Sequence, residues 1–203
     1  MVLQNFIRNF NIFPLDLEDS CHRQIVKNIF EINRKMLVDD YMRNAEQLMR
    51  DWAYFIKNGE AIGYLIFVND EPYGVMYAYI DAYKNATLYA STYDKFDNLH
   101  FYTSQRFLRG FLKTLFTKFK VNKVKVEFAI YNAKVEAAMR YVGLRKEGHL
   151  KGEGRINGKP ITALCLGLTK EDYFNGQKDL EEIKQNIKRI DPGKKRKRKR
   201  GKR

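Results

Sequence analysis

The sequence predicts an α/β (α+β) domain in which helices flank a central sheet, and three neighbouring patterns carry this prediction. Residues 105–119 place large apolar side chains three and four positions apart, the spacing of one face of an α-helix. Residues 121–131 then alternate apolar and charged side chains, as a strand does. A second short helical pattern opens at Asn132 and ends at Gly143. A helix, a strand and a helix in close succession favour a mixed domain with ligand chemistry at a helix N-terminus.

The N-terminal part predicts one strand followed by two helices. Loose alternation over residues 6–15 indicates the strand. Asp19 or Ser20 is a suitable N-cap for the first helix. Residues 40–57 carry the apolar spacing of the second helix, which Gly59 ends. The first helix is expected to bury Ile25, Ile29, Ile32 and Met36.

Three strands are expected next, over residues 62–68, 73–83 and 87–93. The first two are joined by residues 69–72, whose Asn-Asp-Glu-Pro sequence is typical of a tight hairpin. Tyrosines are concentrated on one face of the second strand, where they either pack into the core or line a groove that binds a substrate. That face is expected to comprise Tyr73, Val75, Tyr77, Tyr79, Asp81 and Tyr83.

The stretch over residues 94–103 has two interpretations. Either the preceding strand ends near Tyr93 and a long loop follows, or residues 99–102 form a strand of their own. Farther along, residues 144–154 and 161–168 predict a closing hairpin, because an Asn-Gly pair lies between them.

Length and charge divide the chain into three parts. Its 203 residues are 44% hydrophobic and 14% aromatic, enough for one packed domain, which we place at residues 1–170. Thr169 and the acids after it predict the start of a C-terminal helix over residues 171–190. Residues 191–203 are low in complexity and are expected to be disordered.

The last ten residues hold nine positive charges of the net +14, so the body keeps a net charge of only +5. Cations without apolar partners cannot form a core, and such a run is typical of an arm that binds a polyanion. RNA, DNA or a ribonucleoprotein is the expected partner, with an anionic membrane surface as an alternative. The pattern also resembles a nuclear localisation signal. The residues expected to bind nucleic acid are Lys194, Lys195, Arg196, Lys197, Arg198, Lys199, Arg200, Lys202 and Arg203.

The cysteines and the absence of long apolar runs indicate the compartment. Cys21 and Cys165 form neither a CxxC pair nor a Cys/His metal spacing, so we expect no disulfide framework and no metal. The three histidines are far apart in sequence, which also argues against zinc. No run of about eighteen apolar residues occurs, and the N-terminus lacks the pattern of a signal peptide. A cytoplasmic protein without a membrane span is therefore expected.

Asn132 is followed eleven residues later by Gly143 and Leu144, and then by a Glu-Gly pair at 147–148. This pattern resembles the GNAT superfamily of acyl-CoA-dependent N-acyltransferases, in particular its ribosomal-protein and spermidine N-acetyltransferase-like branch. The resemblance spans roughly residues 5–170. It implies a mixed, mostly antiparallel seven-stranded sheet flanked by helices, whose main cleft is a gap between the fourth and fifth strands.

The resemblance also implies acetyl-CoA as co-substrate and an amine acceptor on a protein or a small molecule. The superfamily's diphosphate loop has the form Gln/Arg-x-x-Gly-x-Gly/Ala, and residues 105–110 match it except that Leu108 replaces the middle glycine. Leu108 is expected to obstruct the approach of backbone N–H groups to phosphate, which nearby arginines offset in part. The residues expected to bind the cofactor are Gln105, Arg106, Arg109, Gly110 and Asn132.

Acyl transfer needs a base for the acceptor amine and an acid for the leaving thiolate. Many GNAT proteins carry the acid as a Tyr seven residues after the Asn. This chain has Met139 there, and Tyr141 lies about 200° farther round the helix. Asp81 and Glu127 are the residues expected to act as the catalytic base. The further candidates are Asp94, Asp97, His100 and His149.

Two functions stay open at this point. Asn132 and Gly110 favour an active acyltransferase that the basic tail brings to ribosomes, nucleoid or another nucleic-acid-bound substrate. Leu108 and Met139 favour a GNAT-fold protein that has lost catalysis and serves as a nucleic-acid-binding or structural component, for example of a virus particle. Binding of acetyl-CoA separates the two.

Overall fold

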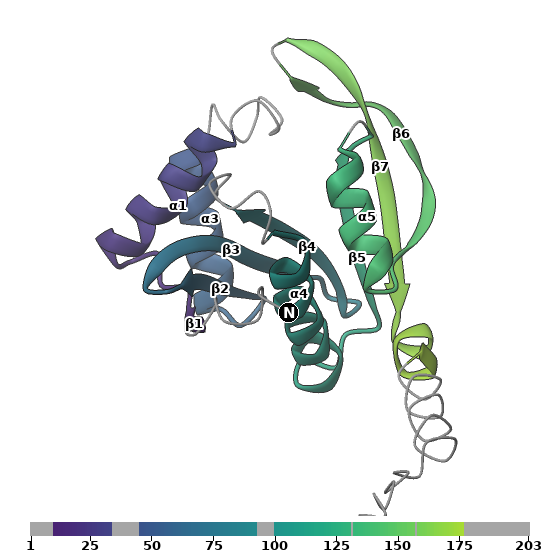
Figure 1. The fold of residues 1–203 in the computed structure, drawn as a ribbon, viewed down its shortest axis with the longest axis horizontal. Coiled ribbons are helices and arrows are strands. Elements are labelled where there is room, and N and C mark those ends of the chain that lie inside the picture. Colours follow the sequence, from purple (N-terminus) through teal and green to yellow (C-terminus); the bar gives the residue numbers. More distant parts are fainter. Residues whose placement is uncertain (1–9, 34–44, 93–99, 131, 157, 177–203) are drawn as a thin grey trace, which may run out of the picture. The chain divides into compact units, whose positions relative to one another are not determined.

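The computed structural model of the chain describes residues 10–33, 45–92, 100–130, 132–156 and 158–176 (Figure 1). The chain divides into two compact units, Met1–Lys170 and Glu171–Arg203. The described part of the second unit, residues 171–176, is helical.

The first unit is built on a seven-stranded sheet with the strand order β1-β2-β3-β4-β5-β7-β6. Every neighbouring pair is antiparallel except β4 and β5, which run parallel. In chain order the elements are β1 (Phe10–Pro14), α1 (Ser20–Ile32), α3 (Ala45–Lys57), β2 (Ala61–Val68), β3 (Glu71–Ile80), β4 (Asn85–Thr92), α4 (His100–Thr117), β5 (Lys123–Ala129), α5 (Ala133–Tyr141), β6 (Arg145–Ile156) and β7 (Lys159–Thr169). The predicted fold class and the predicted order of elements are confirmed.

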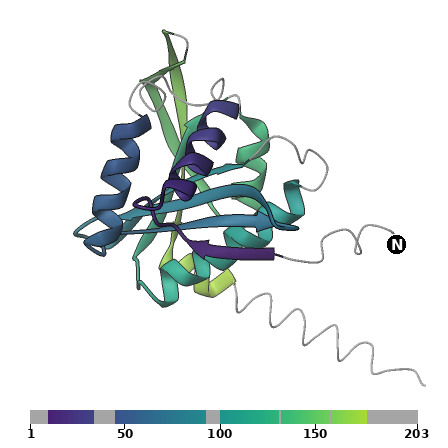
Figure 2. The same cartoon turned by 90° about the vertical axis from the view of Figure 1, so that its left-hand side faces the viewer.

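Helices cover opposite faces of the strands β2 to β4, with α1 and α3 on one face and α4 on the other (Figures 1 and 2). Side chains alternate between these faces along each strand. On the first face Trp52 of α3 stacks on Tyr77 of β3, with ring centroids 4.1 Å apart. On the second face the ring of Tyr64 on β2 meets Phe111 of α4 edge-on at 5.7 Å. Each face therefore has its own aromatic core.

The start of α1 is as predicted, but its buried stripe is different. Asp19 is the N-cap, and its Oδ1 accepts hydrogen bonds from the backbone N–H groups of Cys21 and His22. The predicted Ile29 is buried, whereas Ile32 is 46% exposed. Val26 and Phe30 complete the buried stripe, lying three residues before and one residue after Ile29. The predicted Met36 lies outside the described residues.

The predicted tyrosine-rich face of β3 is interrupted at both ends. A register shift opposite Ile66 and Phe67 leaves Tyr73 as an extra residue in β3. The Tyr73 ring consequently lies near Phe107 of α4, with centroids 6.1 Å apart, on the face opposite Tyr77. β3 ends at Ile80, so the predicted members Asp81 and Tyr83 lie beyond the strand. A bulge and a strand end cannot be read from alternation alone.

Both predicted hairpins are present; β2, β6 and β7 are longer than the sequence patterns indicated, whereas β3 starts two residues and ends three residues before its predicted bounds. Asn69 and Asp70 join β2 to β3 with φ angles of 51° and 64°, and two positive φ angles suit the twist of a two-residue hairpin. Gly158 (φ 75°) lies in the two-residue connection between Ile156 of β6 and Lys159 of β7.

The helix α4 begins five residues before its predicted start. Residues 100–102 are helical, so the interpretation of residues 99–102 as a strand is wrong for these three. β4 ends at Thr92, and residues 93–99 lie outside the described part. The predicted apolar face of α4 is confirmed, with Phe107, Leu108, Phe111, Leu112, Leu115 and Phe116 all buried.

Candidate active site

The strands β4 and β5 pair over only three residues and then separate (Figure 1). The paired residues are Asn85 with Lys123, Ala86 with Val124, and Thr87 with Lys125. β4 continues to Thr92 and β5 to Ala129. Residues 88–92 of β4 are therefore not paired with β5, and their backbone edge faces the opening between the two strands. The predicted separation of the fourth and fifth strands is confirmed.

Tyr89 of β4 and Glu127 of β5 are the first side chains beyond the pairing on the face that carries α1 and α3. Each lies two residues after a member of the last pair, Thr87 and Lys125, and so shares that member's face. The Tyr89 ring packs into the core there, with its centroid 6.0 Å from that of Trp52. Glu127 is exposed. A phenol and a carboxylate thus flank the opening. Glu127 was predicted as a site residue from the sequence, whereas Tyr89 was not, because local patterns do not contain the register of a parallel pair.

The neighbours of Glu127 on the sheet are polar and paired. The Cys165 thiol donates to Glu127 Oε1 at 3.4 Å. Burial, and then the hydrogen bond and charge of Glu127, raise the pKa of the Cys165 thiol to about 11, so at neutral pH it is a proton donor and no nucleophile. Lys123 Nζ lies 2.7 Å from Glu147 Oε1. The Glu147 carboxylate occupies the space where a side chain on Gly167 would lie.

Asp81, the other predicted base, holds the turn between β3 and β4. Its Oδ1 accepts from the backbone N–H groups of Tyr83 at 2.9 Å and Asn85 at 2.8 Å. The Asn85 backbone bond is the main cause that holds the pKa of Asp81 below its usual value. Asn85 starts the paired end of β4, so Asp81 lies away from the end where the strands separate. Catalysis by Asp81 stays a prediction, and its position favours the turn.

Residues 105–110, which match the diphosphate-loop pattern, lie inside α4, as their helical apolar spacing predicts, and do not form a loop. Backbone N–H groups within a helix donate to the carbonyl four residues earlier and are not free for phosphate. Leu108 is 3% exposed and points into the core, so it cannot obstruct a phosphate site as expected. Gly110 faces open space on the outer side of the helix.

The long side chains of this stretch have different neighbours. Gln105 is 3% exposed, and its Nε2 has no hydrogen-bond partner among the residues that the structure describes. The Arg106 guanidinium lies 5.4 Å from the ring of Phe10 in β1, whereas that of Arg109 lies 4.9 Å from the ring of Tyr141 in α5. The structure does not gather the three residues into one anion site, and contact of any of them with a cofactor stays a prediction.

Asn132 lies three residues after the separated end of β5 and caps α5. Its Oδ1 accepts from the backbone N–H of Val135 at 3.3 Å. Met139 is buried in α5, and a thioether has no proton to donate. Met139 therefore cannot act as a general acid.

The C-terminal end of α1 is tied to the separated end of β4. Asn33 Nδ2 donates to the carbonyl oxygen of Thr92 at 2.7 Å and to that of Ile29 at 2.8 Å. This bidentate amide fixes the helix end beside the opening, on the face that Tyr89 shares. Asn33 was not identified from the sequence, since nothing local signals a contact 59 residues away.

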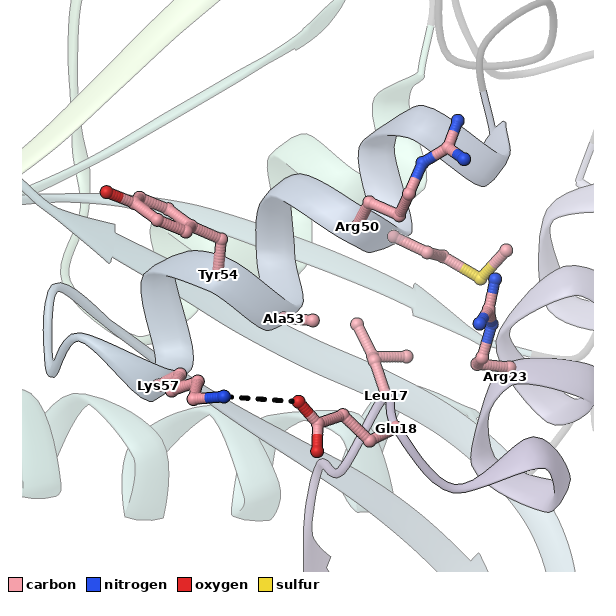
Figure 3. Close-up of a pocket in the computed structure, with 8 residues that line it drawn as sticks. Leu17, Glu18, Arg23, Arg50, Ala53, Tyr54 and Lys57 are labelled. Carbon is pink, nitrogen blue, oxygen red and sulfur yellow. Dashed lines mark ion pairs between the residues drawn. The ribbon is translucent and has the colours of Figure 1, made fainter.

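Two surface hollows lie elsewhere. The hollow in Figure 3, of about 490 Å³, lies between α1 and α3, with Leu17 and Met49 among its lining and the Lys57–Glu18 ion pair at 3.7 Å across it. A second, of about 560 Å³, includes Phe13 of β1 among its lining. Because neither includes Tyr89 or Glu127, the expectation that the gap between β4 and β5 is the main cleft stays a prediction.

The remaining candidates add little to this site. Asp94 and Asp97 lie outside the described residues, His100 begins α4, and His149 is exposed on β6. Within the described ranges, no group of three or more His, Cys, Asp or Glu side chains is placed to hold a metal ion. Among the helices described, none is long and apolar enough to cross a membrane.

A mixed sheet whose one parallel pair is joined by a crossover helix and then separates has the architecture of the GNAT N-acyltransferases. Solved structures bear this out. The spermidine/spermine N-acetyltransferase SpeG from Vibrio cholerae, in mutant form, superimposes with a TM-score of 0.68 at 16% identity, over 83% of this chain and 98% of its own. The ribosomal-protein-S5-alanine acetyltransferase from Vibrio fischeri gives 0.68 at 13% identity, over 82% and 96%.

RimL, a ribosomal L7/L12 alpha-N-protein acetyltransferase solved with coenzyme A, gives a TM-score of 0.68 at 15% identity, over 81% of this chain and 96% of its own. No protein-family model matches the sequence, and no curated protein sequence matches it either. The chain therefore has the GNAT fold, and the solved neighbours with that fold are N-acetyltransferases.

Proposed function

We propose that the protein is an acyl-CoA-dependent N-acyltransferase that transfers an acetyl group from acetyl-CoA to an amine of a protein or a small molecule. The observation that carries this proposal is the separation of β4 and β5 after three residue pairs, with Tyr89 and Glu127 on one face of the opening. The fold of the neighbours, one of them solved with coenzyme A, supports it.

The exposed edge of β4 fits one part of acetyl-CoA. Residues 88–92 present backbone donors and acceptors to which an extended amide chain such as pantetheine can pair as an added strand does. Asn132, at the separated end of β5, is placed to contact the same arm. The helical stretch that holds Arg106 and Arg109 offers no ready backbone cradle for the diphosphate, so these side chains would bind it only as cations.

The residues at the opening divide the proton transfers between them. When bound, acetyl-CoA supplies the acyl thioester. Glu127, an exposed carboxylate, takes the proton that the acceptor ammonium must lose before its nitrogen attacks. Tyr89 offers a hydroxyl to the sulfur that leaves, a role that Met139 cannot fill. Asp81 remains the second candidate for the base.

Titration calorimetry with acetyl-CoA tests the proposal, with binding expected in the micromolar range. Acetyl transfer is then assayed with spermidine and with a peptide that begins with alanine, the acceptors in the names of the neighbours. Glu127→Gln should lower kcat by about 100-fold or more and leave the Kd for acetyl-CoA unchanged. Glu71→Gln, which removes an exposed carboxylate beside the β2–β3 turn, is the matched control. Absence of acetyl-CoA binding overturns the proposal.

A GNAT-fold protein without catalysis is the second candidate, as a nucleic-acid-binding or structural component, including one of a virus particle. The observation that favours it is the helical state of residues 105–110. In addition, the sequence from residue 93 to residue 109 contains no glycine, so a phosphate-binding turn of the usual glycine-rich kind has no residues to form it. Under this candidate acetyl-CoA does not bind, while nucleic acid does.

The polybasic tail supports association with nucleic acid or a ribonucleoprotein under either candidate. Its nine cations, Lys194 to Arg200 together with Lys202 and Arg203, match the charge of a phosphate backbone and carry no base-reading pattern. A cytoplasmic location is consistent with two free cysteines among the described residues.

A further inference from the structure

Two irregularities in β6 decide which of its side chains share a face. In an unbroken strand Lys146 would face away from His149 and Lys151, because side chains alternate. A register shift between Lys146 and Gly148 inserts one extra residue and brings the three onto one face. A second shift, between Lys151 and Gly154, shortens the path to Arg155 and keeps it on that face as well.

The four basic side chains then form a regular row. They lie opposite every second residue of β7: Lys146 opposite Leu166, His149 opposite Leu164, Lys151 opposite Thr162, and Arg155 opposite Pro160. Successive members are therefore about 6.8 Å apart, two residues of an antiparallel strand, and the row is about 20 Å long. All four are exposed. We call these four residues the cation row.

The register also places the row relative to the helices and to the nearest acid. Leu166, opposite Lys146, pairs with Val126 of β5, and the two side chains share one face of the sheet. By the register of β4 and β5, this is the face that α4 covers. The cation row therefore lies on the side of the sheet that carries α4 and α5. Glu147, the extra residue of the first shift, reaches over Gly167 to Lys123 on the opposite face. Its charge is thereby kept away from the row. The side chain of the other acid of β6, residue 153, is not described.

We propose that the cation row binds the phosphate backbone of nucleic acid. Phosphates of one duplex strand follow each other about every 3.4 Å along the axis, so the row offers one side chain that can donate to phosphate, three of the four being Lys or Arg cations, for about every two phosphates. Near its turn, where residues 159–161 of β7 pair with β6 and lie beyond the pairing with β5, the hairpin is a two-stranded β-ribbon, which has a width that a major groove admits. This surface belongs to the folded body and depends neither on the acyltransferase proposal nor on the tail.

Nucleic acid fits the row better than a membrane surface does. Binding to a membrane interface adds buried apolar side chains to the attraction of the lipid headgroups. Among the large apolar residues that are exposed, none is on the described parts of β6 or β7, so the ribbon itself offers no apolar side chain to a membrane; Ile130 after β5 and Tyr141 of α5 lie on the same side of the sheet as the row. The two leucines that lie opposite members of the row, Leu164 and Leu166, are buried.

The full-length triple variant K146Q/K151Q/R155Q tests the proposal. Fluorescence anisotropy with a mixed-sequence 30-base-pair DNA duplex, over a range of salt, gives the slope of log K against log salt concentration. Loss of three phosphate contacts should reduce its magnitude by about 2–3, since each contributes about 0.9. The control K57Q/K113Q/K118Q removes the same number of positive charges at exposed positions outside β6: one in α3, one in α4 and one just after α4. It should reduce the magnitude of the slope by less than about 1, the contribution of about one phosphate contact.

Equal slopes for the triple variant and the control overturn the proposal, as does a triple variant that binds as the parent does. Circular dichroism and the thermal midpoint establish that both variants are folded, which is expected because the row is exposed. Vesicles of phosphatidylserine and phosphatidylcholine form the last arm. If the row binds vesicles and not DNA, it is a membrane surface and the proposal is wrong.

Discussion

Gly110 stands at the residue where the GNAT diphosphate pattern ends, yet it lies in the outer face of α4 with open space beside it. Gly110→Ala should therefore stabilise the fold by roughly 0.5–1 kcal/mol, because alanine is the better helix former. Leu108→Ala should destabilise it by about 2–5 kcal/mol, because the leucine is buried. Urea unfolding measures both effects. A Gly110→Ala protein that is no more stable, but binds acetyl-CoA much less well, would restore the phosphate-binding interpretation.

Gly167 is another residue whose missing side chain has a clear structural use. An alanine there collides with the Glu147 carboxylate and should push it away from Lys123. Gly167→Ala should cost about 0.2–1 kcal/mol of unfolding free energy, the range for an exposed pair, since both partners are over a third exposed. In a Glu147→Ala background the same change should cost nothing. A double-mutant cycle by denaturant unfolding measures the difference, and an equal cost in both backgrounds contradicts the crossing of Glu147 over β7.

Single residues were predictable where a local signal names them. Asp19 and Asn132 cap helices, as their side chains and positions indicate. Glu127 was found as a carboxylate in an alternating strand, but its partner across the opening, Tyr89, follows only from the register of a parallel pair that local patterns do not contain. Asn33 is of the same kind, because its contact with β4 is a tertiary one.

Among the connections between elements, the turn from β3 to β4 depends on an ionised carboxylate. Hydrogen bonds, chiefly from the Asn85 backbone, lower the pKa of Asp81 in the folded state. A depressed carboxyl pKa contributes stability above the unfolded pKa, near 3.9, and this is lost as the pH falls through the folded value. Asp81→Asn should therefore lower the thermal midpoint at pH 7. The gap from the parent should close below about pH 4; a gap that does not change with pH would remove the charge from the explanation.

Periodicity predicted α4 and β5 well because each of them buries a single face. The apolar face of α4 and the alternation of β5 are both as expected. The start of α4 was less predictable, because the motif at residues 105–110 placed it at Gln105 although the residues before Gln105 can also be helical. From His100 to Arg109 there is neither glycine nor proline, so nothing stops the helix from beginning before Gln105. The bulges of β3 and β6 were missed for a different reason: they depend on pairing with a neighbouring strand.

For the whole molecule, the family resemblance implied a mostly antiparallel seven-stranded sheet, but the strand order β5-β7-β6 and the parallel pairing of β4 with β5 were not predicted, since short patterns alone do not specify which strands are neighbours. The same holds for the distribution of charge. Composition shows that the tail carries nine of the net positive charges, but the cation row on β6 needs the register of two strands before its four members share a face. The chain therefore presents two separate basic features, one in its sequence and one in its fold.

Deleting Lys194–Arg203 separates the contributions of these features to nucleic-acid binding. Each phosphate that the tail neutralises adds about 0.9 to the salt slope on duplex DNA, so its removal should flatten the slope strongly and weaken binding equally for all sequences. The thermal midpoint should stay nearly unchanged, because a run of cations without apolar partners adds nothing to a core. Acetyl transfer to a free small amine should survive the deletion, whereas transfer to a protein on nucleic acid should fall. The remaining slope should in turn be sensitive to K146Q/K151Q/R155Q. A truncated protein that keeps the full slope would show that the folded body, with its net charge of +5, provides the whole binding surface.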